Sequence, residues 1–162
     1  MESSTVQSQL VDVQNFLENT VSTLEVFLNE TTMHELTQEK QGDETYYKGL
    51  LSTIRRLLVN SEYCLEECQI ILQKNNFNKE IAEKTLYRIF HGCIEEFFTP
   101  RSDVWYEDSR SAYTGAHAIR FQKDAPDSVD RLLKSLEGNF QRMREELDYY
   151  ENDYRTKMMQ SN

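Results

Sequence analysis

Residues 99–127 read TPRSDVWYEDSRSAYTGAHAIRFQKDAPD, and they separate two regions that both carry a helical pattern. This stretch contains the only two prolines, Pro100 and Pro126, and the only tryptophan, Trp105. A proline cannot continue a helix from its interior, so one helix should end before Pro100 and another should begin near Pro126. We therefore treat residues 101–123 as an insert between helices.

The insert is predicted to form a β-hairpin. Its two short segments, 104–109 and 117–122, are rich in aromatic and β-branched residues, and a polar loop with Gly115 lies between them. An isolated hairpin is only marginally stable in water, so this one should lie against the helices. Ile119 and Phe121 share one face of the second strand and are the expected anchors.

Three long helices are predicted before the insert, because apolar residues recur at spacings of three and four in each. In the first helix they are Val6, Leu10, Val13, Leu17, Val21, Leu24 and Leu28. The second begins near Asp43 and carries Tyr47, Leu51, Ile54, Leu58, Ser61, Leu65, Cys68 and Leu72, and the third carries Ala82, Leu86, Ile89, Cys93 and Phe97. Between the first two, Thr32 and Glu35 fit the capping box of a short helix that Gly42 would end.

After the insert, Asp124 and Pro126 are expected to open a last helix whose apolar stripe runs from Val129 to Met158. At 1.5 Å per residue this single helix would be about 50 Å long. The fold is therefore predicted to be mainly α: one domain over residues 1–162, an antiparallel up-and-down four-helix bundle with a β-hairpin insert before the last helix.

Composition indicates an acidic cytoplasmic protein. The formal net charge of −10 disfavours binding to nucleic acid, which depends on clustered Lys and Arg. No apolar run reaches the roughly 20 residues of a bilayer span, and the N-terminus lacks the basic start of a signal peptide, so no membrane association is expected. The insert is the exception to the acidic balance, because its four basic residues outnumber three acidic ones. An anion would be favoured there.

The insert supplies the first candidate ligand-binding site. Its arginines suit bidentate recognition of a carboxylate or phosphate, and aromatic rings would frame a small organic ligand. The candidate residues are Trp105, Tyr106, Arg110, Tyr113, His117 and Arg120. In the alternative, Glu107 and Asp108 pair with these arginines while the aromatic side chains attach the hairpin to the helices.

The third helix supplies further candidates. His91 and Glu95 are four residues apart, the spacing of two ligands on one helix face, and Arg88 lies beside them. If the hairpin folds over this face, the three would line a cleft with the insert. Otherwise they form a solvated, ion-paired surface. No Glu-x-x-His element accompanies them, so no metal ligand is assigned.

Cysteines and acidic pairs are further candidates for metal binding. Cys64, Cys68 and Cys93 would need a fourth ligand to hold zinc, and they lie on or beside apolar stripes, which favours buried, structural thiols. Acidic pairs on two predicted helices could form a metal site like that of the helical nucleotide pyrophosphohydrolases. In the alternative, they form a solvated face. These pairs are Glu62 with Glu66 and Glu145 with Asp148.

Glycines inside predicted helices call for an explanation, because each costs about 1 kcal/mol relative to alanine. Gly49, Gly92 and Gly138 occupy such positions. Close packing between helices would offset the cost. A ligand or the hairpin pressed against the backbone is the other interpretation.

The sequence contains no P-loop, no nucleophile elbow and no dinucleotide fingerprint, so neither catalysis nor a cofactor is expected. We predict a non-enzymatic module that binds an anionic small molecule or a partner protein through the insert. Two alternatives stay open. One is a metal-dependent hydrolase that uses acids between helices, and the other is a structural homodimer formed along the last helix.

Three segments resemble a known family. They are 82–91 (AEKTLYRIFH), 105–115 (WYEDSRSAYTG) and 143–157 (MREELDYYENDYRTK). With them the chain resembles the YpuI-like family of uncharacterised cytosolic proteins of Bacillus and its relatives over nearly its whole length. The resemblance implies a single-domain cytosolic protein, and it carries over no catalytic residue.

Overall fold

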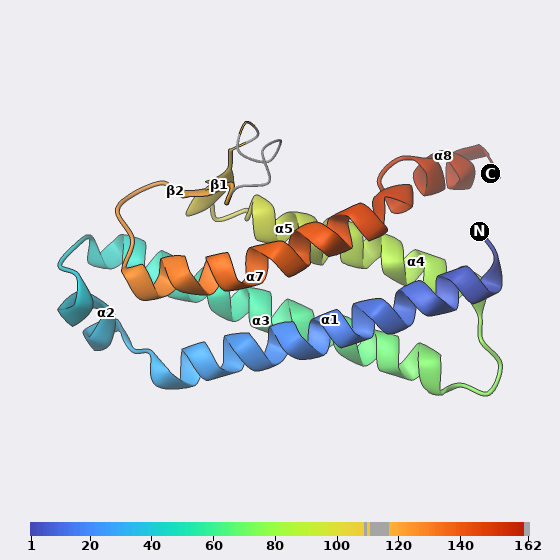
Figure 1. Cartoon of the computed structure of the whole chain (residues 1–162), viewed down its shortest axis with the longest axis horizontal. Coiled ribbons are helices and arrows are strands. Elements are labelled where there is room, and N and C mark those ends of the chain that lie inside the picture. The colour runs from blue at the N-terminus through green and yellow to red at the C-terminus, as the bar shows by residue number, and fades with distance from the viewer. Residues whose placement is uncertain (109, 111–116, 161–162) are drawn as a thin grey trace.

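The structure is a computed structural model that describes residues 1–108, 110 and 117–160. It is mainly helical, with a small two-stranded antiparallel hairpin (Figure 1). Before the insert come α1 (Ser3–Glu30), α2 (Met33–Glu39), α3 (Glu44–Gln73), α4 (Lys79–Ile89), the π-helix η1 (Phe90–Ile94) and α5 (Glu95–Phe98). The insert and C-terminal region contain β1 (Trp105–Glu107), β2 (Ile119–Phe121), α7 (Asp127–Glu146), the 3₁₀-helix η2 (Asp148–Tyr150) and α8 (Asp153–Gln160).

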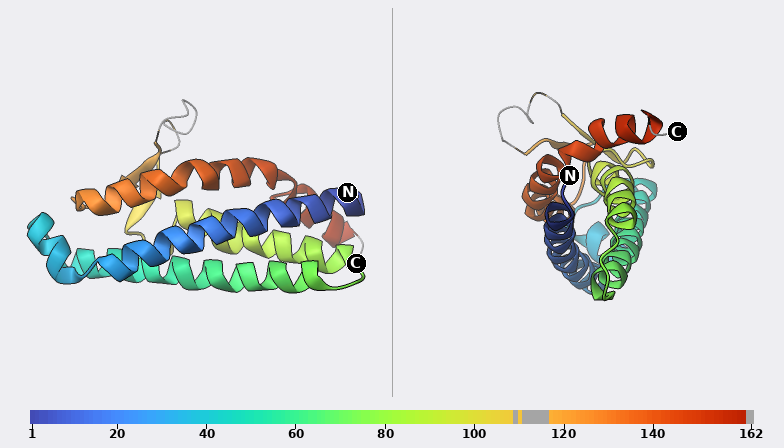
Figure 2. Two further views of the ribbon diagram at one scale, coloured as in Figure 1. Left: turned by 60° about the horizontal axis from the view of Figure 1, so that its bottom comes forward. Right: turned by 90° about the vertical axis from the view of Figure 1, so that its right-hand side faces the viewer.

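The long helices lie lengthwise beside one another and enclose the core. The end-on view in Figure 2 shows α1, α3, the α4–α5 segment and α7 around a common centre. There the ring of Phe140 stacks on Phe97 at 4.0 Å between centroids and meets the edge of Phe16 at 4.8 Å, which joins α7 to α5 and α1. Within the described residues no helix is both long and apolar enough to cross a membrane.

Side-chain caps fix the starts of α2 and α3, close to where the sequence predicts these helices to begin. The Thr32 side chain accepts from the Glu35 N–H at 3.2 Å, and that of Asp43 accepts from the Tyr46 N–H at 3.0 Å. Each bond satisfies a backbone donor that the first turn of a helix leaves unpaired. The short helix α2 ends at Glu39, ahead of Gly42. A Cβ on Gly42 would lie 2.5 Å from the Tyr47 hydroxyl oxygen, so only glycine fits beneath that ring.

The predicted hairpin is confirmed, with shorter strands than expected. β1 and β2 pair antiparallel with Trp105 opposite Phe121 and Glu107 opposite Ile119. Further backbone bonds continue the pairing at both ends, from Asp108 N to Ala118 O at 2.7 Å and from Gln122 N to Val104 O at 3.1 Å.

The prediction of a single last helix of about 50 Å is wrong. α7 ends at Glu146, and the chain then turns through η2 into α8. The turn buries Tyr150 completely, and its hydroxyl donates to Gln9 Oε1 at 3.1 Å. It also sets Tyr154 against Tyr87 of α4, at 5.6 Å between ring centroids. One continuous last helix would not bury these two tyrosines in this way.

Candidate functional site

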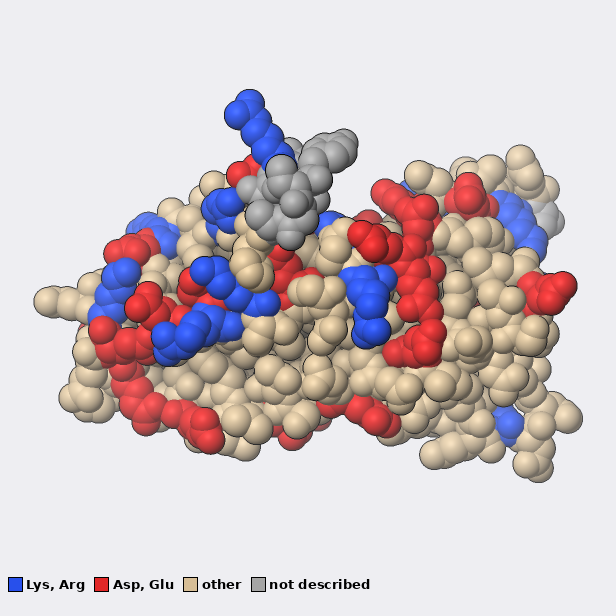
Figure 3. Space-filling view, in the orientation of Figure 1, with Lys and Arg blue, Asp and Glu red and all other residues tan. Residues whose placement is uncertain are grey.

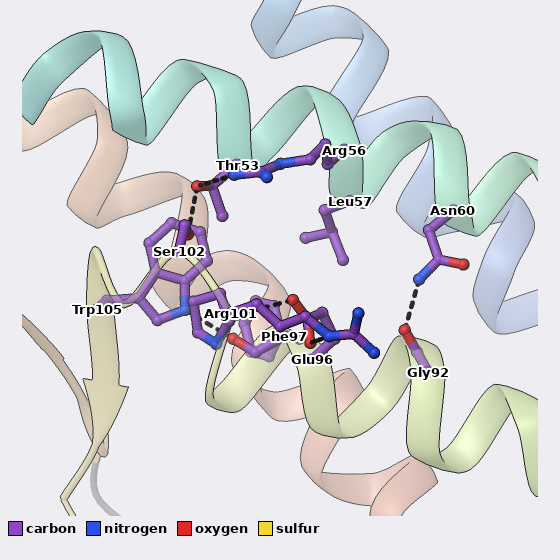
Figure 4. A pocket seen from close by; sticks show the side chains of 11 residues that line it. Thr53, Arg56, Leu57, Asn60, Gly92, Glu96, Phe97, Arg101, Ser102 and Trp105 are labelled. Atoms are coloured by element: carbon purple, nitrogen blue, oxygen red, sulfur yellow. Dashed lines mark hydrogen bonds and ion pairs between the residues drawn. The ribbon is translucent and has the colours of Figure 1, made fainter.

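A cavity of about 360 Å³ opens between α3 and the segment that runs from η1 to the start of the insert (Figure 4). Its apolar wall consists of Leu57, Phe97, Pro100 and Trp105. Its polar residues are Thr53, Arg56, Asn60, Glu96, Arg101 and Ser102. The mixture of an apolar wall with a few converging polar groups is typical of small-molecule sites.

The π-helix η1 forms one side of this cavity. A π-helix bonds each residue to the fifth along, and here the Glu95 N–H reaches Phe90 O. The Gly92 carbonyl turns outward and accepts from Asn60 Nδ2 at 2.6 Å, which links η1 to α3 across the cavity. Single π-turns inside α-helices occur frequently at functional sites. The apolar spacing of the sequence continues through this segment and did not predict the π-helix.

The turn after α5 forms a second side and holds a strained residue. Asp103 has φ 58°, a left-handed conformation that costs a non-glycine residue about 1 kcal/mol or more. A backbone bond from Asp103 N to Pro100 O at 2.9 Å closes the turn, and three bonds that involve side chains hold it in place. The Arg101 N–H donates to Glu96 Oε1 at 2.9 Å, the Ser102 and Thr53 hydroxyls lie 2.7 Å apart, and Trp105 Nε1 donates to Phe97 O at 2.7 Å.

Two guanidinium groups reach the cavity. Arg56 Nη2 lies 3.4 Å from a neutral partner, the Thr53 hydroxyl. The Arg101 side chain is 94% exposed, and its Nε stands 3.9 Å from Glu96 Oε2. Because Glu96 is the one acid among the described residues that line the cavity, the lining has a net positive charge on an acidic protein.

The structure places the predicted insert residues in different surroundings. Trp105 is 1% exposed and borders the cavity, whereas Tyr106, its neighbour on β1, is 42% exposed. Arg110 is exposed, and its backbone N–H donates to Asp108 Oδ1 at 3.0 Å. Tyr113 lies outside the described residues.

His117 and Arg120 come together beside α7 and not at the cavity. Arg120 Nη1 donates to the His117 carbonyl at 2.8 Å, and its Nη2 stands 3.9 Å from Asp108 Oδ2. His117 Nδ1 stands 3.9 Å from Oε1 of Glu137. Glu137 is 7% exposed and accepts from the N–H groups of Ala118, at 2.8 Å, and Ile119, at 3.4 Å. It therefore attaches β2 to α7.

An ion pair makes a second attachment of the hairpin to α7. Arg144 donates from Nη1 and Nη2 to the two carboxylate oxygens of Glu107, at 2.9 and 2.6 Å. The same guanidinium lies 3.8 Å above the centre of the Phe98 ring. Glu107 thus pairs with an arginine of the last long helix and not with Arg110 or Arg120.

The candidates on the third helix do not line the cavity. His91 bridges two elements, with Nδ1 3.2 Å from Glu95 Oε2 and Nε2 3.3 Å from the Tyr150 carbonyl. Arg88, which is 60% exposed, pairs with Glu67 of α3 at 3.1 Å. Among the described residues, the insert and these three residues therefore do not share one cleft.

The chain matches the model of a family described as "Protein of unknown function (DUF3907)" over residues 10–156. It belongs to this family. Over 151 residues it is also 42% identical to "Uncharacterized protein YpuI" of Bacillus subtilis (strain 168), an alignment that covers 93% of this chain and 84% of that protein. No solved structure matches the chain. The resemblance noted in the sequence is thereby confirmed, and the DUF3907 family brings no activity with it.

The other candidates in this DUF3907 member remain apart from the cavity. Cys64, Cys68 and Cys93 are buried free thiols, and burial raises the pKa of Cys68 to about 12, which keeps that thiol protonated and unreactive. Across residues 1–108, 110 and 117–160, no group of three or more His, Cys, Asp or Glu side chains is placed to hold a metal ion.

Sequence reasoning did not select the polar residues of the cavity. They come from α3, from α5 and from the turn at Arg101, and α3 is distant from the other two along the chain. Two signals were present. Gly92 stands out as a glycine inside a helical pattern, and Arg101 and Ser102 directly follow Pro100.

Proposed function

We propose that this DUF3907 member is a non-enzymatic module that binds a small anionic molecule in the cavity between α3 and the start of the insert. The observation that carries the proposal is that two guanidinium groups, Arg56 and Arg101, line one cavity together with a single carboxylate, Glu96. Arginine binds carboxylates and phosphates through two parallel hydrogen bonds, which gives both charge neutralisation and orientation.

The neutral lining supports the same ligand class. The Thr53 and Ser102 hydroxyls and the Asn60 amide can each donate to, or accept from, a polar ligand atom. The apolar wall that includes Trp105 and Leu57 would contact the carbon skeleton of an organic acid. A volume of about 360 Å³ suits a compact metabolite and not a polymer.

The proposal extends to the scaffold and the compartment. The lengthwise arrangement of α1, α3, the α4–α5 segment and α7 supports an up-and-down four-helix bundle. Free thiols at Cys64, Cys68 and Cys93 support a reducing, cytoplasmic location.

The test is a thermal-shift screen with a panel of di- and tricarboxylates, inorganic phosphate and simple phosphate esters. At least one compound should raise the Tm of the wild-type protein by a few degrees at millimolar concentration. Arg56→Ala should abolish that rise without unfolding the protein, because Arg56 is exposed. Arg55→Ala changes the preceding residue of α3, which does not line the cavity, and this variant should retain the rise in Tm.

Two outcomes count against the proposal. One is a panel in which no compound raises the Tm. The other is an equal rise in the wild type, the Arg56 variant and the Arg55 variant, which would place binding elsewhere on the molecule.

A further inference from the structure

A second hollow, of about 580 Å³, lies between α4 and α8, away from the insert. Its apolar lining consists of Ile81, Tyr87, Tyr154, Met158 and Met159. Three cationic residues, Lys84, Arg88 and Arg155, complete the lining, and none of the described residues that line it is acidic.

Some apolar side chains in this hollow are exposed to solvent and are not part of the buried core. Ile81 is 43% exposed and Met159 is 72% exposed. Tyr154 is the one buried residue of α8, Met158 is partly buried against the core, and Met159 is left at the edge of the hollow. A concave apolar surface with a polar rim is typical of a ligand site.

The residues around the hollow carry a net positive charge, whereas the whole chain is acidic. An adjoining hollow of about 370 Å³ shares Lys84, Tyr154 and Met158, and it adds Lys79 and Lys157 with Glu80 and Glu83. Together the two hollows carry five cations and two acids, on a protein whose net charge is −10. Arg88 pairs with Glu67, but the Arg88 side chain is 60% exposed, which weakens this ion pair.

Glu83 adds an unsatisfied polar atom to the adjoining hollow. Its side chain is 6% exposed, its Oε2 has no hydrogen-bond partner among the described residues, and its Oε1 stands 3.9 Å from Lys79 Nζ. A buried polar atom without a partner is costly, and a ligand with a hydroxyl or a bound water beside its head group would supply the missing donor.

We propose that the groove between α4 and α8 binds a single-chain anionic amphiphile, with its acyl chain along Ile81, Tyr87 and Met159 and its head group at Lys84 and Arg155. A free amphiphile and the lipids of an anionic bilayer share this chemistry. The apolar residues line a hollow between two helices and not a flat face, so the occupant is the free, monomeric amphiphile. This site is independent of the cavity at Arg56.

The direct test is isothermal titration calorimetry with dodecanoate below its micelle concentration. Dodecanoate should bind with one-to-one stoichiometry. Acetate, which lacks the chain, and dodecyltrimethylammonium, which reverses the head-group charge, should bind at least about tenfold more weakly, a difference of about 1.4 kcal/mol.

Matched variants locate the binding site. The double variant Lys84→Glu/Arg155→Glu should weaken dodecanoate binding about tenfold. Ile81→Asp, which places a charge in the apolar lining, should do the same. Lys48→Glu/Lys74→Glu reverses two exposed lysines outside the groove, one on α3 and one directly after its last residue, and should bind as the wild type does. Circular dichroism and the Tm of each variant check that it is folded.

Several results would overturn the proposal. They are the absence of dodecanoate binding, equal binding of the anionic and cationic amphiphiles, and equal loss in the groove variant and the α3 control. Co-sedimentation with anionic phosphatidylglycerol vesicles, without binding of monomeric dodecanoate, would assign the surface to membranes instead. Arg56→Ala should leave dodecanoate binding intact, which separates this site from the proposed function.

Discussion

Trp105 serves both the core and the wall of the candidate site. Its indole is 1% exposed and donates to the Phe97 carbonyl at 2.7 Å. Trp105→Phe removes that donor and leaves a buried carbonyl unpaired, so the free energy of unfolding should fall by about 1–3 kcal/mol. Urea denaturation followed by circular dichroism measures the change. Tyr106→Phe, at an exposed neighbour, should have almost no effect, and equal losses in both variants would contradict the role of the indole bond.

Glu146 makes stability depend on pH. Burial and a hydrogen bond with Asp12 raise the pKa of Glu146 from 4.5 to about 7. The folded state therefore binds this proton more tightly than the unfolded state, and the stabilisation is complete below pH 4.5 and lost as pH rises through about 7. Glu146→Gln should gain stability relative to the wild type between pH 5 and pH 8, because the amide does not ionise.

Urea midpoints at several pH values between pH 5 and pH 8 would measure this dependence. Glu25→Gln, at an exposed carboxylate on α1, controls for the loss of a charge and should run parallel to the wild type. If the Glu146 variant also runs parallel to the wild type, Glu146 does not titrate in this range.

Substitutions at Gly92 and Gly138 distinguish an effect on stability from an effect on ligand binding. A Cβ added to either glycine would meet nothing within 4 Å, so Ala at either position should stabilise the protein by about 0.5–1 kcal/mol. Gly92 lines the cavity whereas Gly138 does not. Gly92→Ala should therefore raise the Tm and weaken the ligand-induced shift, while Gly138→Ala raises the Tm alone. Undiminished binding by the Gly92 variant would argue that the ligand does not approach η1.

Gly49 shows a different reason for a helical glycine. A Cβ there would lie 3.3 Å from Cγ1 of Val104, the residue before β1. The start of the hairpin therefore lies close to the α3 backbone at this position. Contact with the hairpin therefore explains the glycine at position 49. Gly92 and Gly138 have open space beside them, so neither close packing between helices nor contact with the hairpin explains them.

At the scale of elements, local chemistry determined what could be predicted. Helix starts at Thr32 and Asp43 follow from capping side chains within the same four residues, and the hairpin follows from short β-prone segments around a polar loop. The π-helix and the break after Glu146 have no local signal, because the apolar spacing continues through both. Contacts with distant residues select them: Asn60 binds the Gly92 carbonyl, and Tyr150 binds Gln9.

The attachment of the hairpin to α7 depends on Glu137. Glu137→Gln keeps one acceptor oxygen but turns an amide N–H₂ toward the backbone donors of Ala118 and Ile119. We expect hydrogen exchange at these two amides to accelerate about tenfold, while exchange within α1 and α3 stays unchanged. Glu145→Gln, an exposed carboxylate on the same helix, is the control. Uniform acceleration throughout the protein would show a global loss of stability instead.

At the scale of the whole molecule, surface charge shows why the site was only partly predictable. Lys and Arg gather near the insert in Figure 3, beside acidic residues on the same face. The sequence indicated that region as favourable for an anion, and Trp105 and Arg101 do border the cavity. Arg56 lies far away in the sequence, on α3, and its place at the same cavity as Arg101 depends on how the helices assemble. Composition and periodicity do not contain that information.

The C-terminal element offers a test of how the molecule is assembled. Removal of residues 153–162 deletes α8 and exposes the Tyr87 surface that Tyr154 covers. Burial of one tyrosine contributes about 2 kcal/mol, so the Tm should fall by about 4–8 °C. Unfolding should remain a single transition in calorimetry, because Tyr154 is the one buried residue that α8 adds to the core, whereas the stacked rings of Phe97 and Phe140 belong to α5 and α7.

The shorter deletion of residues 161–162 is the control for this truncation and should leave the Tm unchanged. The longer deletion should also abolish dodecanoate binding, since α8 supplies one wall of the groove, while the thermal shift caused by the ligand of the Arg56 cavity persists. Loss of both binding activities together, or a second unfolding transition, would mean that α8 is part of the cooperative core and not an element docked on its surface.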